Sequence, residues 1–229
     1  MDRNRIKLKI SLIINIIIVI LTVIASVIMF TGFRFMYGYE IVLESTKLGM
    51  LRFFTVDSNM FMGIVALLFA IDEINVLQEK RDDISINKYI LKLMGTSGVG
   101  LTFLIVFTYL GQISEYGLSS LLMNSNLFFH LIIPIFSILN FIIFEKTDKM
   151  NYKYTFYGII PTIAYAIYYL SNILYHMENG EVSVKYDWYW FVQNGIWTAV
   201  IVAPTILVLS YVISYVLWIL NKNHKKKIP

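Results

Sequence analysis

The stretch ISLIINIIIVILTVIASVIMF (residues 10–30) carries no charged side chain over 21 residues. A helix needs about 20 mainly apolar residues to cross the hydrocarbon core of a bilayer. Similar apolar blocks recur along the chain, without the period-two alternation of a membrane β-barrel. We therefore expect an all-α polytopic membrane protein with six transmembrane helices, at roughly 8–30, 53–76, 90–111, 127–144, 156–176 and 192–220.

The composition supports the same class. Of the 229 residues, 58% are hydrophobic and 15% are charged, whereas soluble domains have about 25% charged residues. No linker is long enough to separate domains, so residues 1–229 are expected to form a single six-helix transmembrane domain. The absence of cysteine excludes disulfides, thiolate nucleophiles and zinc–thiolate sites. We expect no cofactor and no metal.

The basic residues predict the orientation. Cytoplasmic loops of membrane proteins are enriched in lysine and arginine. Fifteen of the 19 basic residues flank the expected helices on one side, and four lie on the other. Both termini are therefore expected in the cytoplasm, in a multi-pass protein of the cell membrane. Membrane orientation accounts for the net charge of +4, so nucleic acid is not an expected partner. The four residues of the outer side are Arg34, Lys47, Arg52 and Lys185.

Polar side chains at membrane depth gather in the outer half of the expected bundle. Such groups are costly in hydrocarbon and usually face the bundle interior or a cavity. Their clustering predicts one polar pocket that opens toward the outer leaflet. The set comprises Thr55, Ser58, Asn59, Gln112, Asn126, His130, Asn172, His176 and Gln193.

Helical spacing indicates which of these residues can meet. Thr55, Ser58 and Asn59 share one helix face, and Asn126 lies one turn before His130. Pro134 has no N–H and clashes with the carbonyl four residues earlier, so the helix should loosen at His130.

Thr55 and His130 are the candidate catalytic residues. A hydroxyl and an imidazole at one depth are the minimum for a nucleophile and its general base. Two simpler interpretations stay open: Thr55 is also a good N-cap, and His130 can serve as a polar contact between helices. Asn59 can stabilise an oxyanion, Asn126 can orient the imidazole, and Ser58, Asn172 and His176 are candidates for substrate binding or positioning.

Three other segments have structural interpretations. GTSGVG (95–100) lacks the lysine and the strand of a phosphate loop, and its small residues favour close helix packing. YDWYWF (186–191) is typical of an aromatic belt at the membrane interface. Asp72 and Glu73 are expected to reach the cytoplasmic interface and to pair there with a basic loop residue.

Two motifs carry a resemblance to a known family. RFFTVDSN (52–59) and HLIIPIFSILNFIIFE (130–145), with a weaker match at PTIAYAIYYL (161–170), resemble the androgen-induced-gene / androgen-dependent-TFPI-regulating-protein family of membrane hydrolases. The resemblance implies a threonine hydrolase of fatty acid esters of hydroxy fatty acids. By motif, its threonine corresponds to Thr55 and its histidine to His130. The segment VDSN after Thr55 is more apolar in the animal proteins.

These observations predict an integral membrane lipid esterase with a threonine nucleophile and a histidine base. Its partners would be membrane lipids and a lipid ester substrate, and its active site would face the outer leaflet. The alternative is a membrane protein that binds or transports a lipid or small molecule without catalysis. An acyltransferase that uses an alcohol in place of water is a third reading.

Overall fold

The computed structural model describes residues 3–39, 43–192, 195 and 197–222. All regular structure in this part of the chain is helical, and five helices are long and apolar enough to cross a membrane. They are Asn4–Thr31, Phe54–Leu77, Ile86–Ile113, Ser125–Phe144 and Trp197–Asn221. Large apolar side chains remain exposed on several of them, as expected for lipid-facing surfaces. The predicted class of an α-helical membrane protein is confirmed at this level.

The helices have the following bounds. They are α1 Arg3–Thr31, η1 Lys47–Arg52, α2 Phe54–Leu77, α3 Ile86–Ile105, η2 Val106–Leu110, α4 Gly111–Ile113, α5 Gly117–Leu121, α6 Ser125–Leu127, η3 Phe128–Ile132, α7 Ile133–Leu139, η4 Asn140–Phe144, η5 Tyr152–Ile159, α8 Ile160–Tyr175 and α9 Trp197–Asn221. The block predicted at 156–176 is divided between the 3₁₀ helix η5 and α8, and α8 has 16 residues. The α-helical part of this block is thus shorter than a typical span.

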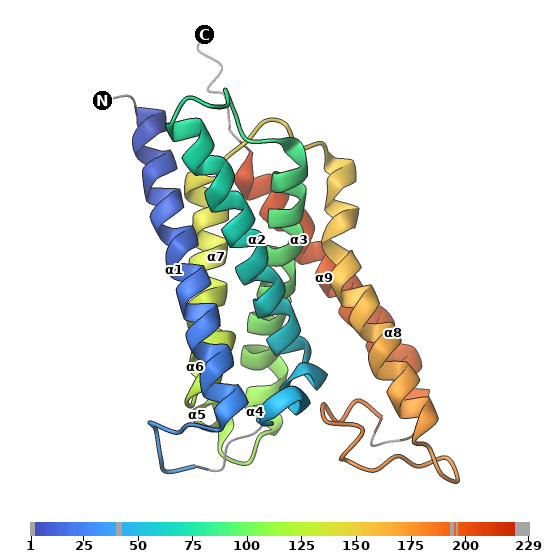
Figure 1. Cartoon of the computed structure of the whole chain (residues 1–229). Coiled ribbons are helices and arrows are strands. Elements are labelled where there is room, and N and C mark those ends of the chain that lie inside the picture. Colours follow the sequence, from blue (N-terminus) through green and yellow to red (C-terminus); the bar gives the residue numbers. More distant parts are fainter. Residues whose placement is uncertain (1–2, 40–42, 193–194, 196, 223–229) are drawn as a thin grey trace.

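The helices run roughly side by side, and the N-terminus and the end of α9 lie at the same end of the bundle (Figure 1). Helix α3 contacts α2, α7, α8 and α9. In Figure 1 the α8–α9 pair diverges from α1 and α2 toward the opposite end.

Glycines of α3 allow the close packing that the segment GTSGVG predicted. A Cβ added to Gly95 would meet the Met62 sulfur of α2 at 2.9 Å, and one added to Gly98 would meet the Ser58 Cβ at 3.3 Å. On another side of α3, a Cβ at Gly100 would lie 3.1 Å from Ile213 of α9. The small residues therefore bring α2 and α9 close to the backbone of α3.

The expected loosening before Pro134 is confirmed. Residues Phe128–Ile132 form a π-helical turn, and Pro134 stands at the start of the α-helix that follows. His130 lies in the middle of this turn. Such π-helical turns are frequent at functional sites, and two others occur in the described part of this chain, at Val106–Leu110 and Asn140–Phe144.

Two expectations about the charged residues Asp72, Glu73 and Lys92 need correction. Asp72 pairs with Arg81 of the following loop at 3.1 Å, as predicted, but Glu73 is fully buried and does not reach the interface. Lys92, one of the fifteen basic residues expected on the cytoplasmic side, is also fully buried. Both point into the bundle because other elements supply polar partners there.

Candidate functional site

An apolar cavity of about 80 Å³ lies between α2, α3, α8 and α9. Val106 and Leu110 of η2, with Tyr189, Phe191 and Val192 of the loop after α8, complete its wall. Six of its lining residues carry a hydroxyl group, and the others are apolar. This composition suits a hydrocarbon chain better than a polar ligand. The six are Thr55, Thr102, Thr162, Tyr165, Tyr169 and Tyr189.

Thr55 lies in the wall of this cavity and does not cap its helix. The N-cap of α2 is Phe53, and no side chain caps this helix end. The N–H groups of Val56 and Asp57 bind the Phe53 carbonyl instead. The simpler interpretation of Thr55 as an N-cap is therefore wrong. The Thr55 side chain is buried.

Ser58 and Asn59 share the Thr55 face of α2, as the spacing predicted. Their side-chain donors, however, already form hydrogen bonds with other groups of the protein. The Ser58 hydroxyl donates to the Thr55 carbonyl (3.2 Å) and contacts the Thr102 hydroxyl (3.1 Å). The Asn59 amide donates both hydrogens, to the carbonyls of Thr55 (2.7 Å) and Phe129 (3.0 Å). Because an amide nitrogen has two donors, Asn59 is unsuited to the expected role as oxyanion donor.

The His130 ring is held in one tautomer by a backbone carbonyl. Its Nδ1 lies 2.5 Å from the Leu121 oxygen, and a carbonyl oxygen only accepts, so Nδ1 carries the proton. The Nε2 atom is then left with a free lone pair. This atom is fully buried and has no hydrogen-bond partner among the described residues. The Leu121 carbonyl therefore fixes the tautomer that leaves Nε2 as the basic atom, which is the orienting role that Asn126 was expected to have.

Asn59 shows how the two candidate catalytic residues are related. It joins the carbonyl of Thr55 to that of Phe129, the residue before His130, so both candidates lie at one level of adjoining helices. No hydrogen bond joins their side chains in the part of the chain that the structure describes, since Nε2 of His130 is unpartnered. Thr55 lines the apolar cavity, whereas His130 does not.

The remaining predicted residues have other surroundings. Asn126 is buried one turn before His130. Asn172 donates to the Tyr186 carbonyl (2.9 Å), and the His176 ring stacks on the Tyr186 ring with centroids 3.6 Å apart. Neither Asn172 nor His176 lines the cavity, and both instead attach the loop to the end of α8.

The segment YDWYWF is not the exposed interfacial belt that the sequence suggested. Asp187, Trp188 and Tyr189 are each at most 6% exposed, because this loop folds back onto the helices. Asp187 accepts hydrogen bonds from the Tyr169 hydroxyl and from the N–H groups of Phe191 and Val192. The Trp188 indole donates to the Tyr165 hydroxyl at 3.0 Å. The buried carboxylate therefore fixes the loop over the cavity.

Tyr189 is the site residue that sequence reasoning missed. Its hydroxyl lies beside the side chains of Thr55 and Tyr165 and the backbone of Phe54 and Thr55, although none of these contacts has regular hydrogen-bond geometry. Burial raises the pKa of Tyr189 to about 12, so the hydroxyl stays protonated at neutral pH and can donate. The aromatic cluster was visible in the sequence, but no local signal showed that it folds inward.

Comparison with protein-family models, curated proteins and solved structures found no match to this chain.

Proposed function

We propose that this chain is a membrane-embedded esterase that hydrolyses lipid esters, such as fatty acid esters of hydroxy fatty acids. The observation that carries the proposal is a hydroxyl in the wall of an apolar cavity, at one level with a histidine whose ring nitrogen is free to accept a proton. The cavity provides a place for an acyl chain, and the two side chains are a nucleophile and a base. The motif resemblance of RFFTVDSN and of the His130 segment points to the same chemistry.

The proposed topology has six spans with both termini in the cytoplasm. Residues 152–175, which form η5 and α8, serve as the fifth crossing. The burial of Lys92 removes one cation from the cytoplasmic loops, but the strong excess of lysine and arginine on that side remains. This orientation places Thr55 and His130 toward the outer leaflet, from which the lipid enters.

The reaction proceeds through an acyl-threonine. The Thr55 Oγ1 attacks the ester carbonyl carbon while Nε2 of His130 takes the hydroxyl proton. The ester bond breaks, and Nε2 returns this proton to the oxygen of the leaving alcohol. A water then gives its proton to Nε2 and attacks the acyl carbon. The fatty acid leaves, and the proton returns to Thr55 Oγ1. The Leu121 carbonyl keeps the ring in the required tautomer throughout.

The developing oxyanion needs a donor, and the Asn59 hydrogens are already used. The Tyr189 hydroxyl is protonated, lies beside Thr55 and lacks a regular partner. We assign it this role. Removing one oxyanion donor typically lowers kcat by about 10²–10³-fold, so Tyr189→Phe should reduce hydrolysis by about this factor.

The test is hydrolysis of a fatty acid ester of a hydroxy fatty acid by the purified chain in detergent. Thr55→Ala should abolish activity, and His130→Gln should lower it by about 10²–10⁴-fold, the usual contribution of a general base. The matched control is Thr102→Ala, which removes a second threonine from the same cavity wall and should retain activity. Full activity in Thr55→Ala would refute the mechanism.

A second candidate is a protein that binds or carries a lipid without catalysis. The observation in its favour is the predominantly apolar wall of the cavity, which needs no reaction to hold an acyl chain. A fluorophosphonate probe separates the two functions. The esterase forms a covalent adduct that mass spectrometry places on Thr55, whereas a carrier forms none.

A further inference from the structure

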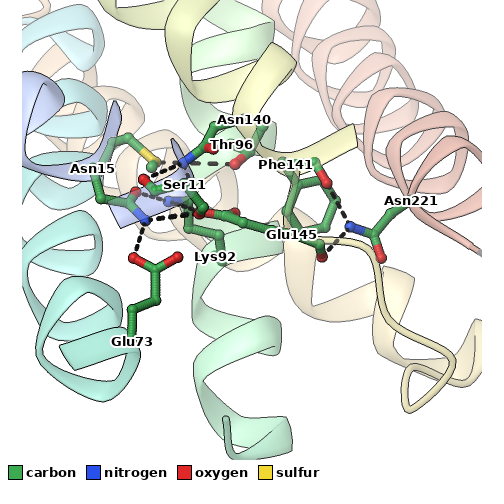
Figure 2. Close-up of polar contacts among 10 residues, drawn as sticks. Ser11, Asn15, Glu73, Lys92, Thr96, Asn140, Phe141, Glu145 and Asn221 are labelled. Atoms are coloured by element: carbon green, nitrogen blue, oxygen red, sulfur yellow. Dashed lines mark hydrogen bonds and ion pairs between the residues drawn. The ribbon is translucent and has the colours of Figure 1, made fainter. Parts of the chain in front are cut away.

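Three ionisable side chains lie buried together, away from the apolar cavity and toward the end of the bundle that holds the N-terminus. They are Glu73 of α2, Lys92 of α3 and Glu145, directly after η4, and none is more than 3% exposed. We call them the ionic cluster. Figure 2 shows Ser11 and Asn15 of α1 and Asn140 of η4 around it. Ionisable groups buried within membrane helices are rare and usually functional.

Glu145 is the ionised partner of Lys92. The Lys92 ammonium lies 2.7 Å from Glu145 Oε1 and also donates to the side-chain oxygen of Asn15. The same Oε1 accepts from the amides of Asn15 (2.9 Å) and Asn140 (2.8 Å) and from the Ser11 hydroxyl (3.2 Å). Four donors on Oε1, one of them a cation, favour the ionised form of Glu145, although its Oε2 has no partner among the described residues.

Far fewer hydrogen-bond donors, and no ion pair in the described chain, stabilise a negative charge on Glu73. Its Oε2 accepts one hydrogen bond, from the Asn15 amide at 3.0 Å, and its Oε1 has no partner among the described residues. No lysine or arginine in the described chain forms an ion pair with it, since Lys92 is bound to Glu145. The Asn15 amide links both carboxyl groups, so two negative charges there would repel each other.

Charge balance then decides the protonation state. With both glutamates ionised, the ionic cluster would carry a net negative charge in the bundle interior. An uncompensated buried ion costs several kcal/mol, more than a buried neutral carboxyl group does. We propose that the ionic cluster is a proton-binding site, in which Glu73 holds an exchangeable proton on Oε1 beside the fixed Lys92–Glu145 ion pair.

A route for the proton lies next to the site. An open polar hollow of about 500 Å³ is lined by residues one helical turn from the cluster: Leu8 before Ser11, Val76 after Glu73 and Tyr89 before Lys92. Tyr89 is therefore the other titratable group that faces the cluster from α3. The hollow also contains exposed acids and bases, Glu79 and Asp82 among them, which can relay protons to and from water.

The test is infrared spectroscopy of the purified full chain in deuterated detergent buffer at neutral pH. The wild type should show the C=O band of a protonated carboxylic acid, and Glu73→Gln should lose it. Glutamine has nearly the shape of the neutral acid, so this variant should fold. Glu145→Gln should also lose the band, because Glu73 then ionises as the partner of Lys92.

Glu115→Gln, at an exposed position in a loop outside this hollow, is the control and should retain the band. The proposal is overturned if the wild type lacks an acid band at neutral pH, or if the band persists in Glu73→Gln. As a second measurement, the thermal stability of the wild type should fall as the pH rises through the titration of Glu73, because the folded state then binds more protons than the unfolded state. Glu73→Gln should flatten this dependence.

Discussion

The buried carboxylate of Asp187 should hold the loop over the apolar cavity, and Asp187→Asn tests this. The wild-type side chain accepts three hydrogen bonds, from the Tyr169 hydroxyl, Phe191 N (3.0 Å) and Val192 N (3.0 Å). An asparagine keeps one oxygen but places an NH₂ group where the second oxygen was. The amide oxygen can retain the two bonds to Oδ1, and the NH₂ group then faces the N–H of Val192.

The size of the effect follows from these bonds. Hydrogen bonds to charged groups contribute about 1.5–3 kcal/mol and those between neutral groups about 0.5–1.5 kcal/mol. Asparagine therefore loses one charged bond and weakens two others, while it removes the desolvation cost of a buried charge. We expect the loop to be destabilised by about 2–4 kcal/mol. Since about 1.4 kcal/mol is a tenfold change, the loop should open at least about 30-fold more often.

Hydrogen–deuterium exchange measures this opening at the amides of Phe191 and Val192. Their exchange should accelerate at least about 30-fold in Asp187→Asn, with little change in α1 or α2. The control is Asp82→Asn, at an exposed position in another loop. Unchanged protection of Phe191 and Val192 in Asp187→Asn would show that the carboxylate does not hold the loop.

Three further substitutions test the packing of the bundle by thermal or denaturant unfolding in detergent. Asn59→Leu should cost about 1–3 kcal/mol, since it removes the side-chain donor of the buried Phe129 carbonyl and one of the two side-chain donors of the Thr55 carbonyl, and an unchanged midpoint would contradict this. Lys92→Met should lower the free energy of unfolding by about 3–5 kcal/mol, because Glu145 then lacks its cation. Adding Glu145→Gln should recover part of this stability. If the double variant recovers none, the ion pair does not stabilise the bundle. Gly158→Ala should destabilise by about 1–3 kcal/mol, because its Cβ would lie 2.1 Å from the Ser214 hydroxyl; wild-type stability would mean that η5 and α9 can move apart freely.

The sequence predicted the features that depend on local patterns. The span expected at 53–76 is α2, Phe54–Leu77, and the one expected at 127–144 lies within Ser125–Phe144, because the length of an apolar run is a local property. The effect of Pro134 was predictable for the same reason, since a proline acts on the carbonyl four residues before it. The shared face of Thr55 and Asn59 followed from helical spacing alone.

Features that depend on contacts between distant segments could not be predicted. Lys92 resembles a loop cation in sequence, and only its contacts with Asn15 and Glu145, 77 and 53 residues away, show why it is buried. The segment around Tyr189 resembles an interfacial belt, and only the hydrogen bonds of Asp187 reveal that it folds inward. In both cases a buried charge decides the structure, and its partners are not neighbours in sequence.

The two buried polar regions differ in a way that bears on their roles. Around Lys92 and Glu145 the amide, hydroxyl and ammonium donors are paired, and the buried atoms without partners in the described part of the chain are acceptors, namely Glu73 Oε1, Glu145 Oε2 and Asn140 Oδ1. Near the apolar cavity, the Nε2 atom of His130 and the hydroxyl of Tyr189 are buried without regular partners. Leaving such atoms unpaired destabilises the fold by about 1–3 kcal/mol each. The packing around them does not by itself offset this cost. In the proposed mechanism a lipid ester supplies the missing partners at the candidate site, because Thr55 passes its proton to Nε2 and the ester oxygen accepts from Tyr189. The unpaired atoms of the two regions therefore call for different partners: an ester at the cavity, and a proton at Glu73 in the ionic cluster.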